Sequence, residues 1–305
     1  YETVHNALNY LKQSLKSMPN STSYDPAISV IGYSHIDTCW LWPYSITRVK
    51  IVNTAISMLR LLNINDRRKE TNFSTPFDEF DQNEFKWKFL ATSALHYKWI
   101  KEDAPDVFDQ IIAEIKKGRW EANGAAWLEP DTNLPSGESL VRQLVMGIRY
   151  FDKEINFDTK NKQTVLFLPD CFGFSGNLPQ IMRKAGLKYF VTSKISWSEY
   201  TQFPYSTFKW RGIDGSDGLS HFVSTPTSWN LNQTTYTGTS TAFELINTYH
   251  NYKQKFVLPE SALHTSGNGD GGGGITESMM MNLNLMNELP RIPGVPRLPS
   301  PSLTE

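Results

Sequence analysis

The stretch Ala27-Ile28-Ser29-Val30-Ile31-Gly32-Tyr33-Ser34-His35-Ile36-Asp37 joins an apolar run to two polar side chains. The apolar part predicts a buried β-strand over residues 27–32. His35 and Asp37 follow this strand, and side chains two positions apart in an extended chain point to the same face. An imidazole and a carboxylate placed in this way can bind one cation, and zinc accepts both ligand types. The stretch therefore predicts a strand that leads into part of a metal site.

Apolar segments of similar character recur along the chain. Further strands are expected at residues 85–92, 119–127, 164–169, 188–192, 219–224 and 261–265. Helical patterns between them cover residues 104–117, a segment that Ser136 can cap, and residues 180–185 behind Pro179. This alternation predicts an α/β fold, with a parallel sheet that is covered by helices and is either open or closed into a barrel. A chain of 305 residues is long enough for one such domain.

Acidic side chains recur just past the predicted strands. Glu129 and Asp131 follow one strand, Asp170 follows another, and Asp270 follows a third. In α/β barrels the active site is built from the loops at the carboxyl ends of the strands. Carboxylates that gather there repel one another unless a cation or a shared proton relieves them. This grouping favours function over the simpler alternatives, in which Asp170 caps a helix and His35 hydrogen-bonds to a nearby acid.

Three other residues have open interpretations. Asp270 lies in a glycine-rich stretch that can bring backbone close to a ligand or form a flexible turn, but that lacks the Lys-Ser/Thr of a phosphate loop. Cys39 would share a face with His35 and Asp37 if the strand continued, although the bulky run Trp40-Leu41-Trp42 indicates that the chain has turned. His264 is the best placed of the other histidines to be a further metal ligand.

Composition excludes some classes of partner. The chain has 30 basic and 31 acidic residues and a net charge of −1, which does not indicate a strongly basic face for binding nucleic acid. No apolar stretch is long enough to cross a bilayer. Two cysteines do not make a disulfide framework, and reduced thiols are expected. The many aromatic residues suit sugar binding and a large core equally well. The compartment stays open between the cytoplasm and a vacuole or lysosome.

Taken in order, a series of motifs resembles the α-mannosidases of glycoside hydrolase family 38, especially their vacuolar, cytosolic and bacterial branch. The motifs are Gly32-Tyr33-Ser34-His35-Ile36-Asp37-Thr38-Cys39-Trp40-Leu41-Trp42-Pro43, Trp127-Leu128-Glu129-Pro130-Asp131, Pro135-Ser136-Gly137-Glu138-Ser139-Leu140-Val141-Arg142-Gln143, Leu168-Pro169-Asp170, Leu178-Pro179-Gln180-Ile181, Ser193-Lys194-Ile195-Ser196-Trp197, Trp210-Arg211-Gly212-Ile213-Asp214-Gly215-Ser216 and Gly269-Asp270-Gly271-Gly272. The similarity runs nearly end to end.

The resemblance implies a seven-stranded β/α barrel with mostly parallel strands and one zinc ion bound by His35, Asp37 and Asp170. It implies an exo-acting retaining α-mannosidase that releases terminal non-reducing α-D-mannose from oligosaccharides by a zinc-assisted double displacement. Asp170 would be the nucleophile, and Asp270 is the candidate acid/base. The implied substrate-binding residues, which border the mannose, are Trp40 and Phe172.

Two departures from the family pattern matter. Tyr33 stands where the family usually has a second histidine. The family's fourth zinc ligand, a histidine downstream of the glycine-rich loop, and the later helical and β-rich domains are missing. We therefore expect an amino-terminal piece of a longer protein, with a helical lead-in at 1–26, the catalytic barrel at 27–288 and a Pro-rich linker or truncated edge at 289–305.

This expectation defines the partners and the rival hypotheses. The partners are mannose-containing oligosaccharides and the downstream remainder of the same protein, on which activity can depend, and homo-oligomerisation is left open. One rival is a metal-dependent carbohydrate deacetylase, which needs no catalytic carboxylate at Asp270. The other is a non-catalytic mannose-binding fragment, which the missing fourth ligand motivates.

Overall fold

The computed structural model describes residues 26–64, 87–155, 162–288 and 295–298, together with positions 3, 6, 7, 9, 10, 13 and 14. Most of the predicted lead-in at 1–26 and most of the predicted Pro-rich segment at 289–305 lie outside the described residues. Within that last segment, the N–H of Arg297 donates to Pro26 O at 2.8 Å and the N–H of Ile28 donates to Arg297 O at 2.9 Å. Leu298 is buried in the main core. Residues 295–298 therefore pack beside the first strand.

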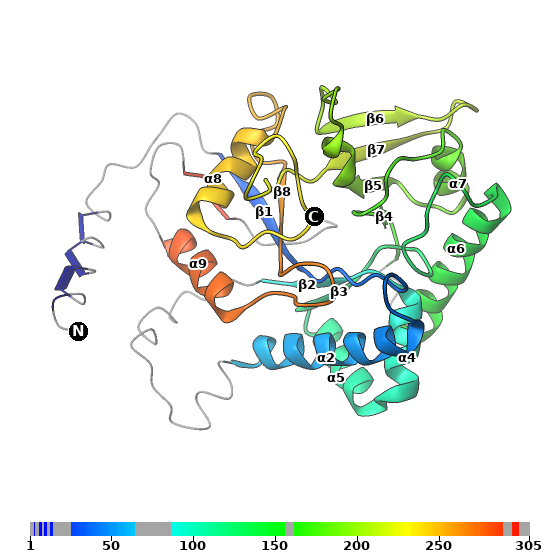
Figure 1. The fold of residues 1–305 in the computed structure, drawn as a ribbon, viewed down its shortest axis with the longest axis horizontal. Helices are drawn as coiled ribbons and strands as arrows, with labels where there is room; N and C mark the ends of the chain where they lie inside the picture. Colours follow the sequence, from blue (N-terminus) through cyan, green and yellow to red (C-terminus); the bar gives the residue numbers. More distant parts are fainter. Residues whose placement is uncertain are drawn as a thin grey trace.

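Eight described strands form two four-stranded sheets (Figure 1). The first sheet has the order β3-β2-β1-β8, and its strands β1 (Ile28–Tyr33), β2 (Phe89–Ala91), β3 (Trp120–Ala122) and β8 (Ala262–Ser266) are all parallel. The second has the order β4-β5-β7-β6. Its strands β4 (Val165–Phe167), β5 (Tyr189–Thr192) and β7 (Asp217–Phe222) are parallel, and β6 (Thr207–Arg211) runs antiparallel to β7. The predicted α/β class with a parallel sheet is confirmed.

The described strands do not form the expected seven-stranded barrel as one continuous sheet. Each of the seven predicted segments overlaps a parallel strand, but no ladder joins the two four-stranded sheets within the described residues. Between β3 and β4, hydrogen bonds from the side chain of Gln163 to the backbone stand where strand-to-strand backbone hydrogen bonds would be expected. This side chain accepts from the N–H groups of Gly124 and Ala125 and donates to Ala122 O. On the other side, the N–H of Ser224 donates to Leu263 O at 3.1 Å.

Strand β6 was not predicted. Its side chains are only partly buried or exposed, because it is the outer strand of its sheet, and a search for buried apolar runs misses such a strand. The tight turn from Gly212 to Ser216 joins it to β7, with the N–H of Gly212 donating to Ser216 O at 2.8 Å.

Helices cover both sheets, and Figure 1 shows α2, α4 and α5 together on one side of the first sheet. The described α-helices are α2 (Tyr44–Leu62), α4 (Ala94–Asp103), α5 (Pro105–Lys116), α6 (Gly137–Tyr150), α7 (Leu178–Lys184), α8 (Ala242–Asn251) and α9 (Glu277–Glu288). Helices α5, α6 and α7 correspond to predictions, and Ser136 caps α6 by accepting from the N–H of Ser139. Helix α2 was missed. It is rich in β-branched residues, which are weak helix formers, and burial of its inner face against the core outweighs that weakness.

A buried apolar cluster brings the two sheets together. It draws on β1, β2 and β8 of the first sheet and on β4, β5 and adjoining segments of the second, through Ile31, Tyr33, Leu90, Val165, Phe167, Val191, Val223, Tyr236 and Leu263. Burial of this surface supplies a rigid base under the loops that follow the strands. In the described part of the chain, none of the helices is both long enough and apolar enough to span a membrane.

Candidate active site

Polar residues converge at the carboxyl ends of β1, β4 and β8. His35 and Asp37 follow β1, Asp170 follows β4, and Asp270 follows β8. The N–H groups of Gly271 and Gly272 donate to His35 O at 3.1 and 2.9 Å, which fixes the glycine-rich loop against the end of β1. Gly272 has a φ of +91°, and a Cβ there would clash with Thr54 Oγ1, so this contact requires glycine.

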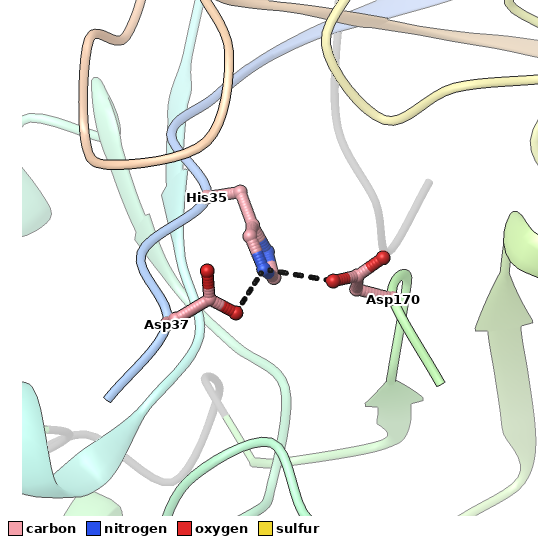
Figure 2. A group of neighbouring side chains, drawn as sticks. All are labelled: His35, Asp37 and Asp170. Atoms are coloured by element: carbon pink, nitrogen blue, oxygen red, sulfur yellow. Dashed lines mark hydrogen bonds and ion pairs between the residues drawn. The ribbon is translucent and has the colours of Figure 1, made fainter. Parts of the chain in front are cut away.

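His35, Asp37 and Asp170 form a cluster that could hold a metal ion (Figure 2). Nε2 of His35 lies 3.4 Å from Asp37 Oδ1 and 3.5 Å from Asp170 Oδ2. The three ligand atoms lie within 4.8 Å of one another, and the His35 residue is 3% exposed. The structure thus brings together the three residues that the resemblance implies as metal ligands.

The spacing of this cluster fits a small divalent cation. Ligand atoms about 2.0–2.1 Å from a tetrahedral zinc lie about 3.4 Å from one another. The two measured separations from Nε2 match that value. One nitrogen and two carboxylate oxygens are ligands that zinc accepts, and three protein ligands are typical of catalytic zinc sites.

Electrostatics also favours a positive charge at this point. Burial disfavours the charged form of His35, but hydrogen bonds with Asp170 and Asp37 and the charge of Glu129 outweigh it and raise the pKa of His35 to about 10. Burial raises the pKa of Asp170, yet His35 and Lys194 together lower it below its usual value. Acidic groups that hold a proton so strongly would also attract a cation, which would compete with that proton.

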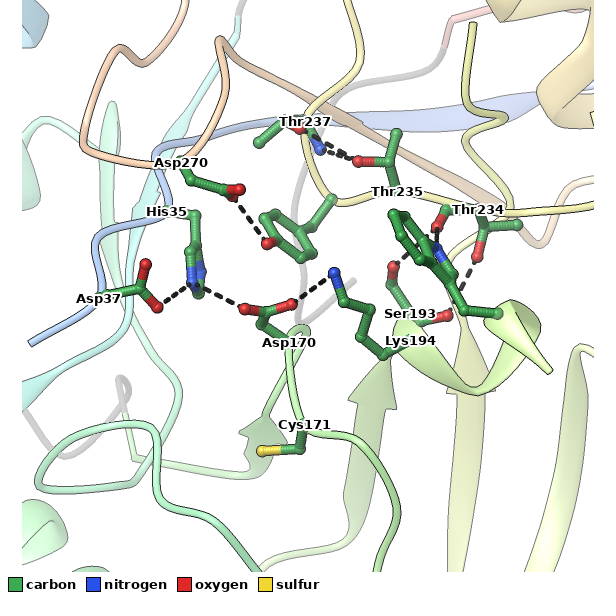
Figure 3. A network of polar contacts seen from close by, with 12 residues as sticks. His35, Asp37, Asp170, Cys171, Ser193, Lys194, Thr234, Thr235, Thr237 and Asp270 are labelled. Atoms are coloured by element: carbon green, nitrogen blue, oxygen red, sulfur yellow. Dashed lines mark hydrogen bonds and ion pairs between the residues drawn. The ribbon is translucent and has the colours of Figure 1, made fainter. Parts of the chain in front are cut away.

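Asp170 is held from two further directions. Nζ of Lys194 lies 2.8 Å from Asp170 Oδ1, and Figure 3 shows Asp170 between His35 and Lys194. The N–H of Lys194 donates to Pro169 O at 3.3 Å, because β4 and β5 are neighbours and Lys194 follows β5. Sequence reasoning quoted Lys194 within a motif but assigned it no role. Its place just past a predicted strand was the available signal.

Glu129 is the other acidic neighbour of the cluster. Its Oε1 accepts from the N–H of Asp170 at 2.6 Å, and its Oε2 lies 3.7 Å from His35 Nδ1. Burial raises the pKa of Glu129 to about 7, against the opposing charge of His35. The sequence placed Glu129 at the rim of the site without giving it a function.

Asp270 reaches the cluster through Tyr236. The hydroxyl of Tyr236 donates to Asp270 Oδ1 at 2.8 Å and also interacts with Asp170. Burial, followed by the charges of Asp170 and Asp270, raises the pKa of Tyr236, which keeps this hydroxyl protonated. Tyr236 was not singled out from the sequence, and no pattern around it marks it.

The two predicted substrate-binding aromatics differ in position. Phe172 lines a cavity of about 320 Å³ together with His35, Asp37 and Asp170, and it is 82% exposed. Trp40 is 62% exposed, packs edge-to-face on Trp42 and is not among the residues that line this cavity.

Neither Cys39 nor His264 belongs to the group of possible metal ligands, although Cys39 lines the same cavity. The chain bends through Trp40-Leu41-Trp42 as predicted, and the Cys39 thiol donates to Trp42 O at 3.6 Å. His264 is fully buried, with Thr248 Oγ1 at 2.9 Å from Nδ1 and Ser240 Oγ at 3.2 Å from Nε2. Hydroxyl groups therefore engage both of its ring nitrogens.

Comparison with known proteins identifies relatives over most of the chain. Residues 25–303 match the model of the glycosyl hydrolases family 38 N-terminal domain. The chain is 35% identical over 293 residues to "Alpha-mannosidase G" of Dictyostelium discoideum, covering 96% of this chain and 24% of that protein. It is 38% identical over 263 residues to "Alpha-mannosidase" of Saccharomyces cerevisiae, covering 85% of this chain and 21% of that protein. The chain thus spans less than a quarter of the length of these relatives.

Among solved structures, an alpha-mannosidase from Enterococcus faecalis V583 is similar with a TM-score of 0.61 and 18% sequence identity. The match covers 91% of this chain and 28% of that chain. At this identity the likeness concerns the fold.

Proposed function

The chain belongs to glycosyl hydrolase family 38, and we propose that it supplies the metal-binding catalytic site of an α-mannosidase. The observation that carries the proposal is the cluster of His35, Asp37 and Asp170, in which Nε2 lies 3.4 and 3.5 Å from the two carboxylate oxygens and all three ligand atoms lie within 4.8 Å of one another. A site of this kind is expected to act on terminal non-reducing α-D-mannose of oligosaccharides. When bound, zinc would supply a Lewis acid and a template for sugar hydroxyl groups.

Asp170 is our proposed nucleophile. Its pKa lies below the usual range, so it is ionised at neutral pH, and Lys194 and Glu129 fix the side chain and the backbone of this residue. The carboxylate would attack the anomeric carbon as the glycosidic bond breaks, which gives a covalent glycosyl-enzyme. Water would then attack the same carbon and release Asp170.

Asp270 is our proposed acid/base. It would give its proton to the leaving oxygen in the first step and take a proton from water in the second. The contact of Tyr236 with both carboxylates supports a short separation between them, and about 5–5.5 Å is typical of retaining enzymes. Phe172, which lines the cavity, would border the sugar, and Trp40 is proposed to do so from the rim.

We also propose that the two four-stranded sheets are the two arcs of a seven-stranded barrel with β6 outside it. The parallel direction of the other strands, the shared apolar cluster and the hydrogen bond from Ser224 to Leu263 support this. The limits of this domain at 27–288 remain a prediction.

Two measurements on the purified protein test the function. Metal content by mass spectrometry should give about one zinc per chain, and 4-nitrophenyl α-D-mannoside should release nitrophenol with β-mannoside as the control substrate. Proton NMR of the first product should show α-mannose, as retention requires. Metal-free protein that neither binds zinc nor turns over substrate, alone or with the downstream portion, would exclude the proposal.

A further inference from the structure

Glu129 contacts two of the three residues of the metal cluster. It lies in the loop between β3 and α6, and its side chain is 19% exposed. Its Oε1 accepts from the backbone N–H of Asp170 at 2.6 Å, and its Oε2 lies 3.7 Å from Nδ1 of His35. The carboxylate therefore joins the loop after β4 to the residue after β1.

The loop that carries Glu129 is itself anchored on both sides. Just before it, the N–H of Leu128 donates to Oε1 of Gln143 on α6 at 3.1 Å. Just after it, Pro130 O accepts from the thiol of Cys171 at 3.0 Å. These contacts hold the Glu129 backbone between the helix and the Asp170 loop, so its carboxylate has a defined place.

At this position the Glu129 carboxylate would orient two of the metal ligands without binding the cation itself. If Nε2 of His35 binds a metal, that nitrogen must present its lone pair and Nδ1 must carry the proton. A carboxylate or hydroxyl near Nδ1 fixes that tautomer, orients the ring and makes Nε2 more basic. The hydroxyl of Tyr33 is the hydrogen-bond partner of Nδ1 at 3.2 Å, and Glu129 Oε2, at 3.7 Å, acts on Nδ1 through its negative charge. The other Glu129 oxygen fixes the backbone of Asp170.

We propose that Glu129 is a positioning residue that preforms the metal site, by orienting the His35 ring through Nδ1 and the Asp170 loop through its backbone N–H. The inference rests on the proposed function, because it requires that His35 and Asp170 bind a cation. Glu129 touches neither the metal nor the sugar in this role. Its removal should therefore weaken metal binding more than it weakens folding.

The test compares variants of the full chain. Glu129→Ala removes both contacts, and Glu129→Gln keeps an acceptor for the Asp170 N–H but loses the negative charge that faces Nδ1. Glu138→Gln is the matched control, because Glu138 is an exposed acid at the start of α6 that accepts from Arg142 Nε at 2.8 Å and is not among the residues that line the cavity. Zinc affinity is measured by competition with a chromophoric chelator, and the visible spectrum of the cobalt-substituted protein reports ligand geometry.

Zinc affinity should fall about 10- to 100-fold in Glu129→Ala, by less in Glu129→Gln, and should stay at the wild-type value in Glu138→Gln. The cobalt spectrum should change in Glu129→Ala alone or most strongly there. The melting temperature of the metal-free variants should match that of the control.

Several results would overturn the inference. Zinc affinity of Glu129→Ala equal to that of Glu138→Gln would show that Glu129 does not position the ligands. A loss of affinity that accompanies unfolding of the metal-free variant would assign Glu129 a structural role instead. Wild-type protein that binds no zinc, while its His35→Ala variant behaves identically, would refute the metal site itself, which separates failure of the proposed function from failure of this inference.

Discussion

Two buried histidines, one within β8 and one just past the end of the neighbouring strand β1, have opposite surroundings. His264 lies within β8, paired with Val30 of β1, and its ring nitrogens meet the hydroxyls of Thr248 and Ser240. His35 follows β1, and its ring meets the carboxylates of three acids. Burial lowers the pKa of His264 to about 3, whereas the carboxylates raise the pKa of His35 to about 10.

The difference shows that burial alone does not make a reactive site. Both rings are almost inaccessible, so desolvation disfavours charge on each. The hydroxyl partners of His264 satisfy a neutral ring and leave no net charge to be balanced. The middle of β8 is therefore a buried polar site with a structural role. Carboxylates at the end of β1 leave a negative charge that a proton or a cation must balance.

The largest effect is expected from Asp170→Asn. Asparagine keeps the shape but removes the proposed nucleophile and one anionic metal ligand, so kcat/KM on an aryl α-mannoside should fall about 10⁴-fold or more. Steady-state kinetics and zinc content should be measured beside Asp214→Asn, an exposed acid that hydrogen-bonds to Ser216. Activity of Asp170→Asn within about ten-fold of the control would remove Asp170 from the chemistry.

The same substitution at the two histidines should separate them. His35→Gln should lose stoichiometric zinc and activity, because the nitrogen ligand is gone. His264→Gln should keep zinc, while its free energy of unfolding falls by about 1–3 kcal/mol because two buried hydroxyls lose a well-placed partner. Metal analysis and urea unfolding of both variants check this. Zinc loss in both variants, or in neither, would contradict the contrast.

Sequence reasoning located the strands because they depend on local pattern, and apolar runs predicted segments that overlap the seven parallel strands. The spacing of His35 and Asp37 predicted two candidate ligands that share a face, and the strand-end position of Asp170 predicted that it lies at the same edge of the sheet. Only the family resemblance implied that Asp170 completes a metal site. The family resemblance supplied the roles, which geometry alone does not.

Contacts between segments that are distant in the sequence could not be predicted from the sequence. Lys194 meets Asp170 because β4 and β5 pair, and Tyr236 meets Asp270 although it lies in an irregular segment. His264 had the right position on a strand for a ligand, but the two hydroxyls that engage it come from α8 and from the segment before that helix. The edge strand β6 and the Gln163 contacts that interrupt the sheet likewise depend on tertiary structure.

A smaller effect is expected at the link between the two proposed catalytic carboxylates. Tyr236→Phe removes the hydroxyl that donates to Asp270, and a typical hydrogen bond contributes about 0.5–1.5 kcal/mol. We therefore expect kcat to fall about 2- to 12-fold while zinc content stays at the wild-type value. Tyr205→Phe, at an exposed tyrosine, is the control. A drop in zinc content together with kcat would mean that Tyr236 supports the metal cluster instead of Asp270.

The smallest effect concerns acid sensitivity and reports on His264. Its pKa in the folded protein, about 3, lies below the value of about 6.5 expected when unfolded, so the unfolded chain binds an additional proton between these limits. The stabilisation that comes from keeping His264 neutral is therefore complete above pH 6.5 and is lost as the pH falls toward 3, with about 2 kcal/mol lost by pH 5.

Urea unfolding of metal-free wild type and of His264→Gln at pH 5 and pH 7.5 measures this change in the free energy of unfolding. The variant should lose less stability than wild type between these pH values, although His221, whose pKa burial also lowers, leaves some dependence in both. Equal pH dependence would mean that His264 is not held neutral, and the contrast with His35 would then rest on the metal ligands alone.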